Sequence, residues 1–302
     1  MNLVELNGQF STEDKCREQL KRLRWPEGVI CPRCKSKTIS RLFTQSKFEC
    51  SDCRYQFSVT VGTVFHDSHL PLTSWFMATL LICEAKKGMS ACQIQRTLGI
   101  GSYKTAWYLC HRIRAAMAAC DKPMLDGKIE MDETYVGGRG KGLTKRGRGT
   151  KKRPVLGIRQ RNGELRLFHA ENVTSRSLEK FMRENISKDA DIVFTDELAA
   201  YPNIAKRMGL KHAMVQHGIK EYVRGDAHTN TIESAFSLFK RGLRGSWHKL
   251  SAKHLQSYLE EMSFRFNRRD NSDLFLDTLR HMVTAPVLTY EKLTTDKKET
   301  AA

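Results

Sequence analysis

The sequence predicts an α/β protein whose strand-rich second half follows a cysteine-rich module and a helical module. Two close cysteine pairs near the N-terminus predict the first module, and three helical stretches after them predict the second. From residue 128 onward the elements alternate between strands and helices. The chain has 302 residues, of which 40% are hydrophobic and 28% are charged. This is the composition of a folded protein with roughly two domains.

Charge indicates the kind of partner. Lys plus Arg number 51 and Asp plus Glu number 33, so the formal net charge is +18. Such an excess favours a polyanion, either nucleic acid or an anionic membrane surface. The longest apolar run, near residues 75–83, is shorter than the roughly 20 residues of a membrane-spanning helix, and the first residues lack a signal-type apolar core. We therefore expect a cytoplasmic protein that binds nucleic acid and no membrane.

The N-terminal residues predict a short helix and then a metal site. Residues 11–24 read as a helix capped by Ser11 or Thr12, with acids in its first turn and bases in its last. After it comes the pattern C-x2-C-x15-C-x2-C. Four thiolates at this spacing predict a tetrahedral structural zinc site, a zinc ribbon, with redox or incidental pairs as the alternative. The pattern is formed by Cys31, Cys34, Cys50 and Cys53.

The cysteine pattern predicts the metal of the ribbon more specifically than it predicts the ribbon's function. Basic residues surround it and favour contact with phosphates, whereas a purely stabilising ribbon is the alternative. The other five cysteines are interpreted as small buried hydrophobic residues.

The next segment predicts a helix-turn-helix module. Helices are expected over 72–87, 90–98 and 102–119, with Ser90 and Ser102 as caps and Gly99 ending the second. In such a module the last helix enters the major groove. The alternative is a helical bundle with a solvated basic face. The residues expected to contact DNA are Lys104, Thr105, His111 and Arg112.

The second half predicts a sheet flanked by helices, after a linker over 121–128. The tight turn at Asn162-Gly163 joins two of its strands. Strands are expected over 128–136, 155–160, 164–173, 191–197 and 211–217, and helices over 175–185, 199–209, 230–243 and 251–267. This order is that of a ribonuclease-H-like domain with a mixed five-stranded sheet. The predicted domains are 1–62 (helix and ribbon), 63–122 (helical module), 123–275 (ribonuclease-H-like) and 276–302 (polar tail).

Three carboxylates occupy positions suited to phosphoryl transfer. Asp132 lies in a strand, Asp196 ends a buried strand, and Glu233 lies in the first turn of a helix. Lys240 follows Glu233 by two helical turns and so shares its face. Converging carboxylates favour two Mg²⁺ or Mn²⁺ ions, which suit displacement at a phosphodiester.

Each of these assignments has a rival. Glu130 and Glu133 compete with Asp132, and Asp191 and Glu197 compete with Asp196. Glu233 could instead belong to a capping box whose N-cap is Asn230.

The sequence resembles a known family. The run HTNTIESAFSLFKRGLRGSWHKLSAKHLQSYLEEMSFRFNRR, the upstream motifs MDETYVGG and VFTDELAAYP, and the ribbon CPRC…CSDC together resemble the transposases of bacterial insertion sequences of the ISXO-like type. The resemblance covers roughly residues 15–270 with all motifs in order.

The resemblance implies an Asp-Asp-Glu triad, which maps onto Asp132, Asp196 and Glu233, with Lys240 holding a phosphate near the scissile bond. Some relatives carry Asn in the third role, so Asn230 is a rival; the spacing of Glu233 to Lys240 favours Glu233. The implied chemistry is hydrolysis that frees a 3′-hydroxyl, followed by attack of that hydroxyl on target DNA.

A basic loop and one histidine complete the expected DNA contacts. Residues 139–153 hold eight basic residues, four glycines and no acid, which predicts a mobile loop that clamps DNA beside Asp132 or, alternatively, a solvated loop. His228 precedes the helix of Glu233 and is expected to contact DNA or orient a ligand, or else to pack. The loop residues assigned to DNA are Lys145, Arg146, Arg148, Lys151, Lys152 and Arg153.

The function predicted from the sequence is therefore a DDE transposase that cleaves and joins DNA. The alternatives are a transposase-derived DNA-binding protein whose catalytic centre is unused, and a host nuclease or ribbon-type regulator, which leaves the C-terminal motif run unexplained. The expected partners are terminal inverted repeats and target DNA. Pairing two ends requires a dimer or higher oligomer on DNA, associated with the nucleoid when bound.

Overall fold

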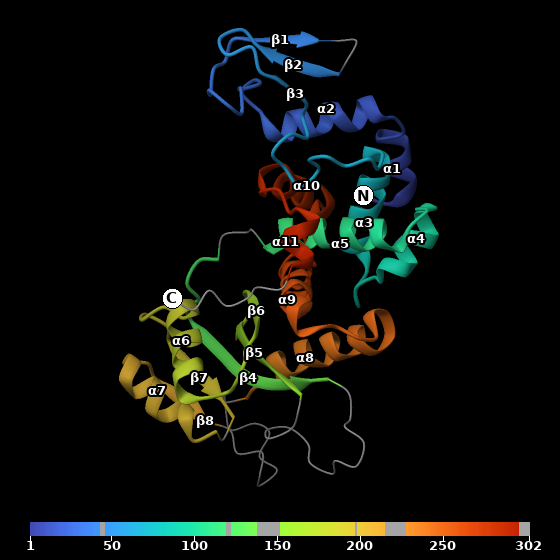
Figure 1. Ribbon diagram of the computed structural model, residues 1–302. Coiled ribbons are helices and arrows are strands. Elements are labelled where there is room, and N and C mark those ends of the chain that lie inside the picture. The colour runs from blue at the N-terminus through green and yellow to red at the C-terminus, as the bar shows by residue number, and fades with distance from the viewer. Residues whose placement is uncertain (43–45, 119–121, 138–151, 197, 215–227, 296–302) are drawn as a thin grey trace. The chain divides into compact units, whose positions relative to one another are not determined.

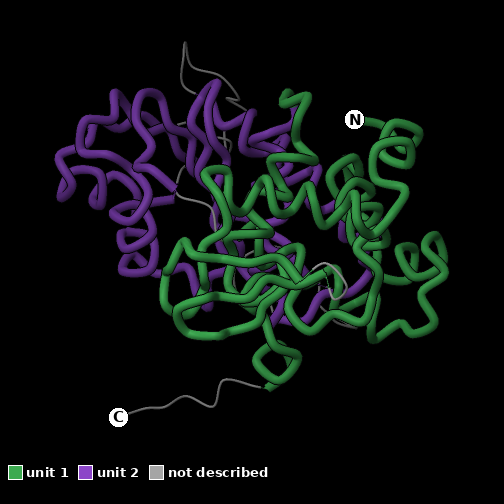
Figure 2. The backbone as a smooth tube through the Cα atoms, turned by 90° about the horizontal axis from the view of Figure 1, so that it is seen from above, with its two compact units in different colours: residues 1–120, 270–302 green, residues 121–269 purple. Residues whose placement is uncertain are grey.

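The computed structural model describes residues 1–42, 46–118, 122–137, 152–196, 198–214 and 228–295 (Figure 1). The chain divides into two compact units (Figure 2). Unit 1 comprises residues 1–120 and 270–302, and unit 2 comprises residues 121–269. The break at residue 120 lies close to the predicted boundary at 122, but the C-terminal residues belong to unit 1.

Unit 1 begins with two helices and a three-stranded antiparallel ribbon. The helices are α1 (Leu3–Gln9) and α2 (Glu13–Arg24), and the strands are β1 (Ile39–Leu42), β2 (Lys47–Cys50) and β3 (Gln56–Phe57). Thr12 caps α2, because its side chain accepts a hydrogen bond from the Lys15 N–H. The sequence did not predict α1, which Asn2 and Glu5 begin as a capping box. Trp25 packs edge-on against Phe48 and Phe57 and forms the ribbon's small core.

The rest of unit 1 is helical. It contains α3 (Leu72–Glu84), α4 (Ala91–Leu98), α5 (Tyr103–Ala118), α10 (Leu274–Thr284) and α11 (Tyr290–Thr294). Ser90 caps α4 and Gly99 ends it in the left-handed conformation, as predicted. The expectation of a polar tail over 276–302 is wrong for its first part. Helix α10 buries Phe275, Leu279 and Met282, because its apolar side chains recur at helical spacing and face the unit's core.

Unit 2 is built on a mixed five-stranded sheet. Its strands are β4 (Lys128–Val136), β5 (Arg153–Gln160), β6 (Leu165–His169), β7 (Ile192–Thr195) and β8 (His212–Met214), in the spatial order β6-β5-β4-β7-β8. The first three strands pair antiparallel, whereas β7 pairs in parallel with β4, and β8 pairs in parallel with β7. This confirms the predicted ribonuclease-H-like α/β domain.

Helices cover both faces of the sheet. They are α6 (Ser175–Asn185), α7 (Ala200–Met208), α8 (Asn230–Gly242), which continues into the π-helical turn η3 (Leu243–Trp247), and α9 (Ala252–Asn267). Helices α6 and α7 bury Phe181 and Ile204 against Ile129 and Met131 of β4. Helices α8 and α9 pack on the other face, where Val136 of β4 is buried. Alternate residues of β4 therefore face α8.

Gly157 of β5 lets α8 approach the sheet closely. It lies opposite Asp132 of β4 in the antiparallel register. A Cβ atom at Gly157 would lie 2.7 Å from Ile232 Cδ1 and 2.7 Å from Phe236 Cζ, both on α8. The missing side chain thus sets the distance between α8 and the strand that carries Asp132.

Within the described part of the chain, no helix is long and apolar enough to cross a membrane.

We predict that Gly157→Ala destabilises unit 2 by about 1–3 kcal/mol, since overpacking forces buried side chains from their preferred positions. Thermal unfolding followed by circular dichroism measures the change. Gly245→Ala is the control in the same unit, because nothing lies within 4 Å of a Cβ atom there. Equal melting temperatures for the two variants would contradict this account of Gly157.

Candidate functional site

Two aspartates lie side by side on neighbouring parallel strands. Glu130 of β4 pairs with Phe194 of β7, so two residues further along Asp132 stands level with Asp196. Asp196 directly follows β7, and its Oδ1 accepts a hydrogen bond of 3.2 Å from the Leu198 N–H. The ends of parallel strands are where α/β sheets place their sites. The structure thus brings the first two predicted carboxylates together.

Glu133 joins these aspartates, although the sequence assigned it only the status of a rival. Carboxylate oxygens of Asp132, Glu133 and Asp196 all lie within 4.8 Å of one another. Glu133 alternates with Asp132 along β4, and its Oε2 accepts a hydrogen bond of 2.9 Å from the buried Tyr201 hydroxyl of α7. Its proximity to Asp132 in sequence was the only signal available. Among the described residues, these three form the acidic group that could hold a metal ion.

Glu233 and Lys240 lie on α8 and face Asp132 across a cavity of about 360 Å³. Glu233 lies outside the group within 4.8 Å, but it lines the same cavity as Asp132. The other lining residues are Thr134, Phe236, Ser237, Arg241 and Arg244. The cavity therefore has the Asp132 carboxylate on the β4 side, and Glu233 and three basic side chains along α8 and η3. An anion held by the bases would lie beside the carboxylates.

The capping-box alternative for Glu233 is wrong. The N-cap of α8 is Thr229 and not Asn230, and no side chain of the N-cap residue caps the helix. The Thr229 hydroxyl instead donates to Glu233 Oε1 at 3.1 Å. Glu233 is thereby oriented by its neighbour and is not used to close the helix end.

Burial and the neighbouring acids perturb the ionisation of Asp132. Burial raises the pKa of Asp132 to about 8, and the neighbouring Asp196 and Glu133 charges add to this effect. Glu233 also raises the pKa of Asp132, while the Glu133 N–H, which donates to Asp132 Oδ1 at 2.7 Å, lowers it. Burial lowers the pKa of Lys240, whereas Asp132 raises it. Hard oxygen donors that repel one another in this way fit a divalent cation such as Mg²⁺ or Mn²⁺.

We predict that Asp132→Asn raises the melting temperature of the metal-free protein at pH 8. An aspartate in an unfolded chain titrates near about 3.9. The folded state holds this proton more tightly, so stability is lost as the pH rises from about 4 to about 8. The gain is on the order of 1–3 kcal/mol at pH 8 and vanishes near pH 4.

Thermal unfolding across this pH range, with and without Mn²⁺, measures the effect. Mn²⁺ should stabilise the parent protein more than the variant. If the melting temperature of the parent protein changes neither with pH nor with Mn²⁺, the proposed repulsion around Asp132 is contradicted.

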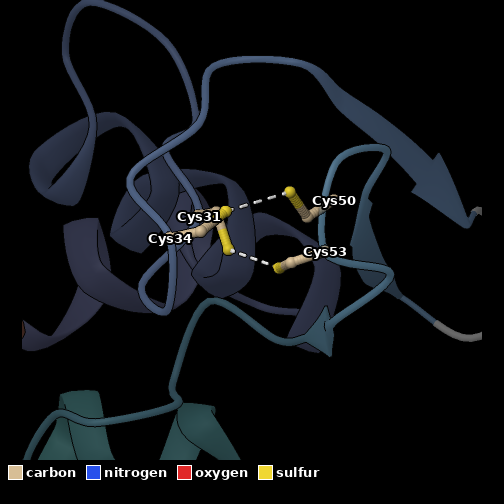
Figure 3. Close-up of side chains that lie close together, drawn as sticks. All are labelled: Cys31, Cys34, Cys50 and Cys53. Atoms are coloured by element: carbon tan, nitrogen blue, oxygen red, sulfur yellow. Dashed lines mark hydrogen bonds between the residues drawn. The ribbon is translucent and has the colours of Figure 1, made fainter.

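The four ribbon cysteines form a second group that could hold a metal ion (Figure 3). Cys31 and Cys53 sulfurs lie 3.7 Å apart, and those of Cys34 and Cys50 lie 3.5 Å apart. The two knuckles share one geometry. The residue after each pair, Lys35 or Arg54, has positive φ. The Lys35 N–H donates to the Cys31 carbonyl at 3.0 Å, and the Arg54 N–H donates to the Cys50 carbonyl at 2.9 Å.

Backbone N–H groups prepare this cluster for metal. Although burial opposes it, hydrogen bonds from the N–H groups of Cys34 and Arg33 lower the pKa of Cys31 to about 6. Hydrogen bonding from the Cys53 backbone N–H likewise lowers the pKa of Cys50. The pKa of Cys34 is raised to about 12: the Ser36 backbone N–H lowers it, but the side chains of Cys53, Cys50 and Cys31 and burial raise it more. Thiolates are the form that binds metal, so four converging sulfurs, two of them with lowered pKa values, fit Zn²⁺.

We predict that the purified protein carries one zinc ion and that Cys50→Ser loses it, because a hydroxyl replaces a buried thiolate ligand. Elemental analysis gives the zinc content. Cys92→Ser, on the exposed face of α4, is the matched control. Full zinc content in the Cys50 variant would rule out this ligand set.

The helical module presents only some of its predicted DNA contacts. Lys104 and Thr105 are exposed on α5, and Lys104 Nζ lies 4.3 Å from the centroid of the Tyr290 ring. His111 and Arg112 are only 1% and 3% exposed. The Arg112 guanidinium donates to the His66 carbonyl and lies over the Trp75 ring. We therefore correct the expectation that His111 and Arg112 contact DNA, since both pack inside unit 1.

The basic loop is described only at its end. Lys145, Arg146, Arg148 and Lys151 lie outside the described residues. Arg153 belongs to β5 rather than to the loop, and its Nη1 donates to the Leu250 carbonyl at 2.7 Å. Lys152 lies near enough to Lys240 to lower its pKa, which puts it near the cavity. His228 is partly buried, with Nδ1 3.2 Å from Glu130 Oε1, outside hydrogen-bond geometry.

Comparison with known proteins matches both the region of the carboxylates and the region of the ribbon cysteines. Residues 124–267 match the ISXO2-like transposase domain, and residues 11–56 match a transposase zinc-ribbon domain. Over 275 residues the chain is 32% identical to an uncharacterized protein in transposable element ISH50 of Halobacterium salinarum, covering 85% of this chain and 91% of that protein. The chain therefore belongs to the ISXO2-like transposase family.

Two solved structures show only a faint likeness. A chain in the crystal structure of the Mos1 strand transfer complex is 10% identical, covers 69% of this chain and 74% of its own, and has a TM-score of 0.29. A chain in the crystal structure of a pre-cleavage Mos1 transpososome is also 10% identical. The match covers 71% of this chain and 79% of that chain, with a TM-score of 0.21.

Proposed function

We propose that this transposase cuts and joins DNA strands at the cavity between β4 and α8. The observation that carries the proposal is that Asp132 of β4 lines one cavity with Glu233 and Lys240 of α8. A carboxylate oxygen of Asp196, which directly follows β7, lies within 4.8 Å of one of Asp132. Carboxylates alone would repel DNA, but the bases along α8 and η3 give the same cavity a phosphate-binding side.

Asp132, Asp196 and Glu233 would hold the divalent metal ions, and Glu133 is a fourth candidate ligand. When bound, the metal supplies charge stabilisation at the phosphodiester and activation of the attacking oxygen. Lys240 would hold a non-bridging phosphate oxygen as a point charge. Arg241 and Arg244 would bind neighbouring phosphates and keep the strand in register with the carboxylates.

The reaction we propose has two displacements. Water first opens a phosphodiester at an element end and leaves a 3′-hydroxyl. That hydroxyl then attacks a phosphodiester of target DNA, and the target's own 3′-oxygen leaves. The partners are thus terminal inverted repeats and target DNA. Joining two ends calls for a dimer or higher oligomer on DNA.

A second candidate function is DNA binding without catalysis. The ribbon and the exposed Lys104 and Thr105 support it independently of the carboxylates. It predicts end binding that Mg²⁺ does not convert into cleavage. The intact set of carboxylates and Lys240 favours the catalytic function.

We predict that Asp196→Asn and Glu233→Gln each lower strand cleavage and joining by at least about 10³-fold, because each removes a charged ligand from the metal site, while end binding persists. Assays use the element's terminal inverted repeats with Mg²⁺, Mn²⁺ or EDTA. Glu184→Gln on the exposed side of α6 is the control for the same chemical change.

Glu133→Gln, measured in parallel, shows which residue completes the carboxylate set. Loss in the Glu133 variant with full activity in the Glu233 variant would transfer the third role to Glu133. Parental joining by Asp196→Asn would overturn the proposed site.

A further inference from the structure

A fully buried glutamate holds the start of α8. Glu130 of β4 is 0% exposed and lies two residues before Asp132, on the same face of the strand. Its Oε2 accepts three hydrogen bonds from α8. They come from the Thr231 N–H at 3.0 Å, the Ile232 N–H at 3.2 Å and the Thr231 hydroxyl at 2.6 Å. A side chain of β4 thus does for α8 what an N-cap residue does for its own helix.

This helix end has no cap from its own N-cap residue. Thr229 stands at the N-cap, but its side chain makes no capping hydrogen bond, since its hydroxyl donates to Glu233 instead. The first N–H groups of a helix need acceptors, and a negative charge there also favours the helix dipole. Glu130 supplies both from another element. Its bonds therefore join β4 to the first turn of α8.

Arg161 holds the second oxygen of Glu130. Its Nε donates to Glu130 Oε1 at 2.8 Å, and its Nη2 donates to the His228 carbonyl at 3.0 Å, just before α8. The guanidinium lies 4.2 Å from the centroid of the Phe194 ring on β7, next to Glu130 in the sheet. A buried carboxylate needs such a partner, because a charge without one is costly in the interior. Both oxygens are engaged, so Glu130 is not placed to bind metal.

We propose that Glu130 is a positioning residue of the active site. Through its bonds to Thr231 and Ile232 it sets where α8 begins on β4, and hence where Glu233 stands relative to Asp132. Glu233 lies one residue beyond the bonded Ile232, and Asp132 lies two residues beyond Glu130. The inference rests on the proposed function, in that this distance matters for catalysis. Displacements of about 1 Å can cost on the order of 10²-fold in rate.

The test compares Glu130→Gln and Thr231→Val with Leu178→Ala. Glu130→Gln removes the negative charge. Thr231→Val removes only the hydroxyl donor of the exposed residue Thr231 and leaves the hydrogen bonds from the Thr231 and Ile232 N–H groups. Leu178 of α6 is buried on the opposite face of the sheet, so its variant loses stability without touching α8. Hydrogen exchange of residues 228–236, the rate of DNA joining and the Mn²⁺ concentration for half-maximal joining are measured for each.

The expected result is faster exchange at the start of α8 in both test variants, greater for Glu130→Gln. Joining should fall by about tenfold or more in Glu130→Gln, with a raised Mn²⁺ requirement. Leu178→Ala should keep the parental Mn²⁺ requirement and parental exchange over residues 228–236. A shift in metal requirement separates positioning from general loss of stability, which lowers only the folded fraction.

Parental exchange at α8 in both test variants would overturn the inference. So would a Glu130→Gln variant whose joining and Mn²⁺ requirement match those of Leu178→Ala. If the parent protein joins no DNA with either metal, the proposed function fails. In that case hydrogen exchange and Mn²⁺ binding by the variants still decide whether Glu130 positions the carboxylates.

Discussion

The close seating of α8 on β4 and β5 is the constraint on which the site depends. The absence of a side chain at Gly157 admits Ile232 and Phe236 to the sheet, and Glu130 caps the helix from the strand beneath it. Both contacts lie within one turn of Glu233. Because Asp132 shares β4 with Glu130 and pairs with Gly157, the same two contacts set both sides of the cavity. Packing and the proposed catalysis are therefore coupled through one helix.

Electrostatics explains why the acidic minority matters in so basic a chain. Asp132, Glu133 and Asp196 repel one another within 4.8 Å, and burial strengthens this repulsion. Lys240, Arg241 and Arg244 lie on the far side of the cavity and counter it only in part. A site arranged in this way gains stability from a cation and attracts a phosphate chain. For the proposed function, the net charge of +18 would favour the phosphate chain, and the clustered acids would favour the cation.

Local patterns predicted most of the elements. Cysteine spacing identified the ribbon, capping residues marked α2 and α4, and the strand order identified the ribonuclease-H-like sheet. Burial was harder to predict. His111 and Arg112 read as groove-facing residues on a basic helix, yet both side chains pack inside unit 1. The C-terminal residues read as a polar tail, yet α10 contributes to the core of unit 1. Composition does not show which face of a helix meets a neighbour.

The sequence by itself determined the family and the zinc-ribbon cysteines, because these depend on which residues occur and how they are spaced. Only the tertiary structure decided which acids meet. Glu130 precedes Asp132 by two residues and Glu133 follows it by one, but Glu133 lies with Asp196 and Glu130 bonds to α8. From the sequence Glu233 could equally have capped the start of α8, but in the structure Glu130 of β4 accepts the hydrogen bonds there. Side chains from separate elements compete for the same hydrogen-bonding groups, and that competition is settled only when the elements pack.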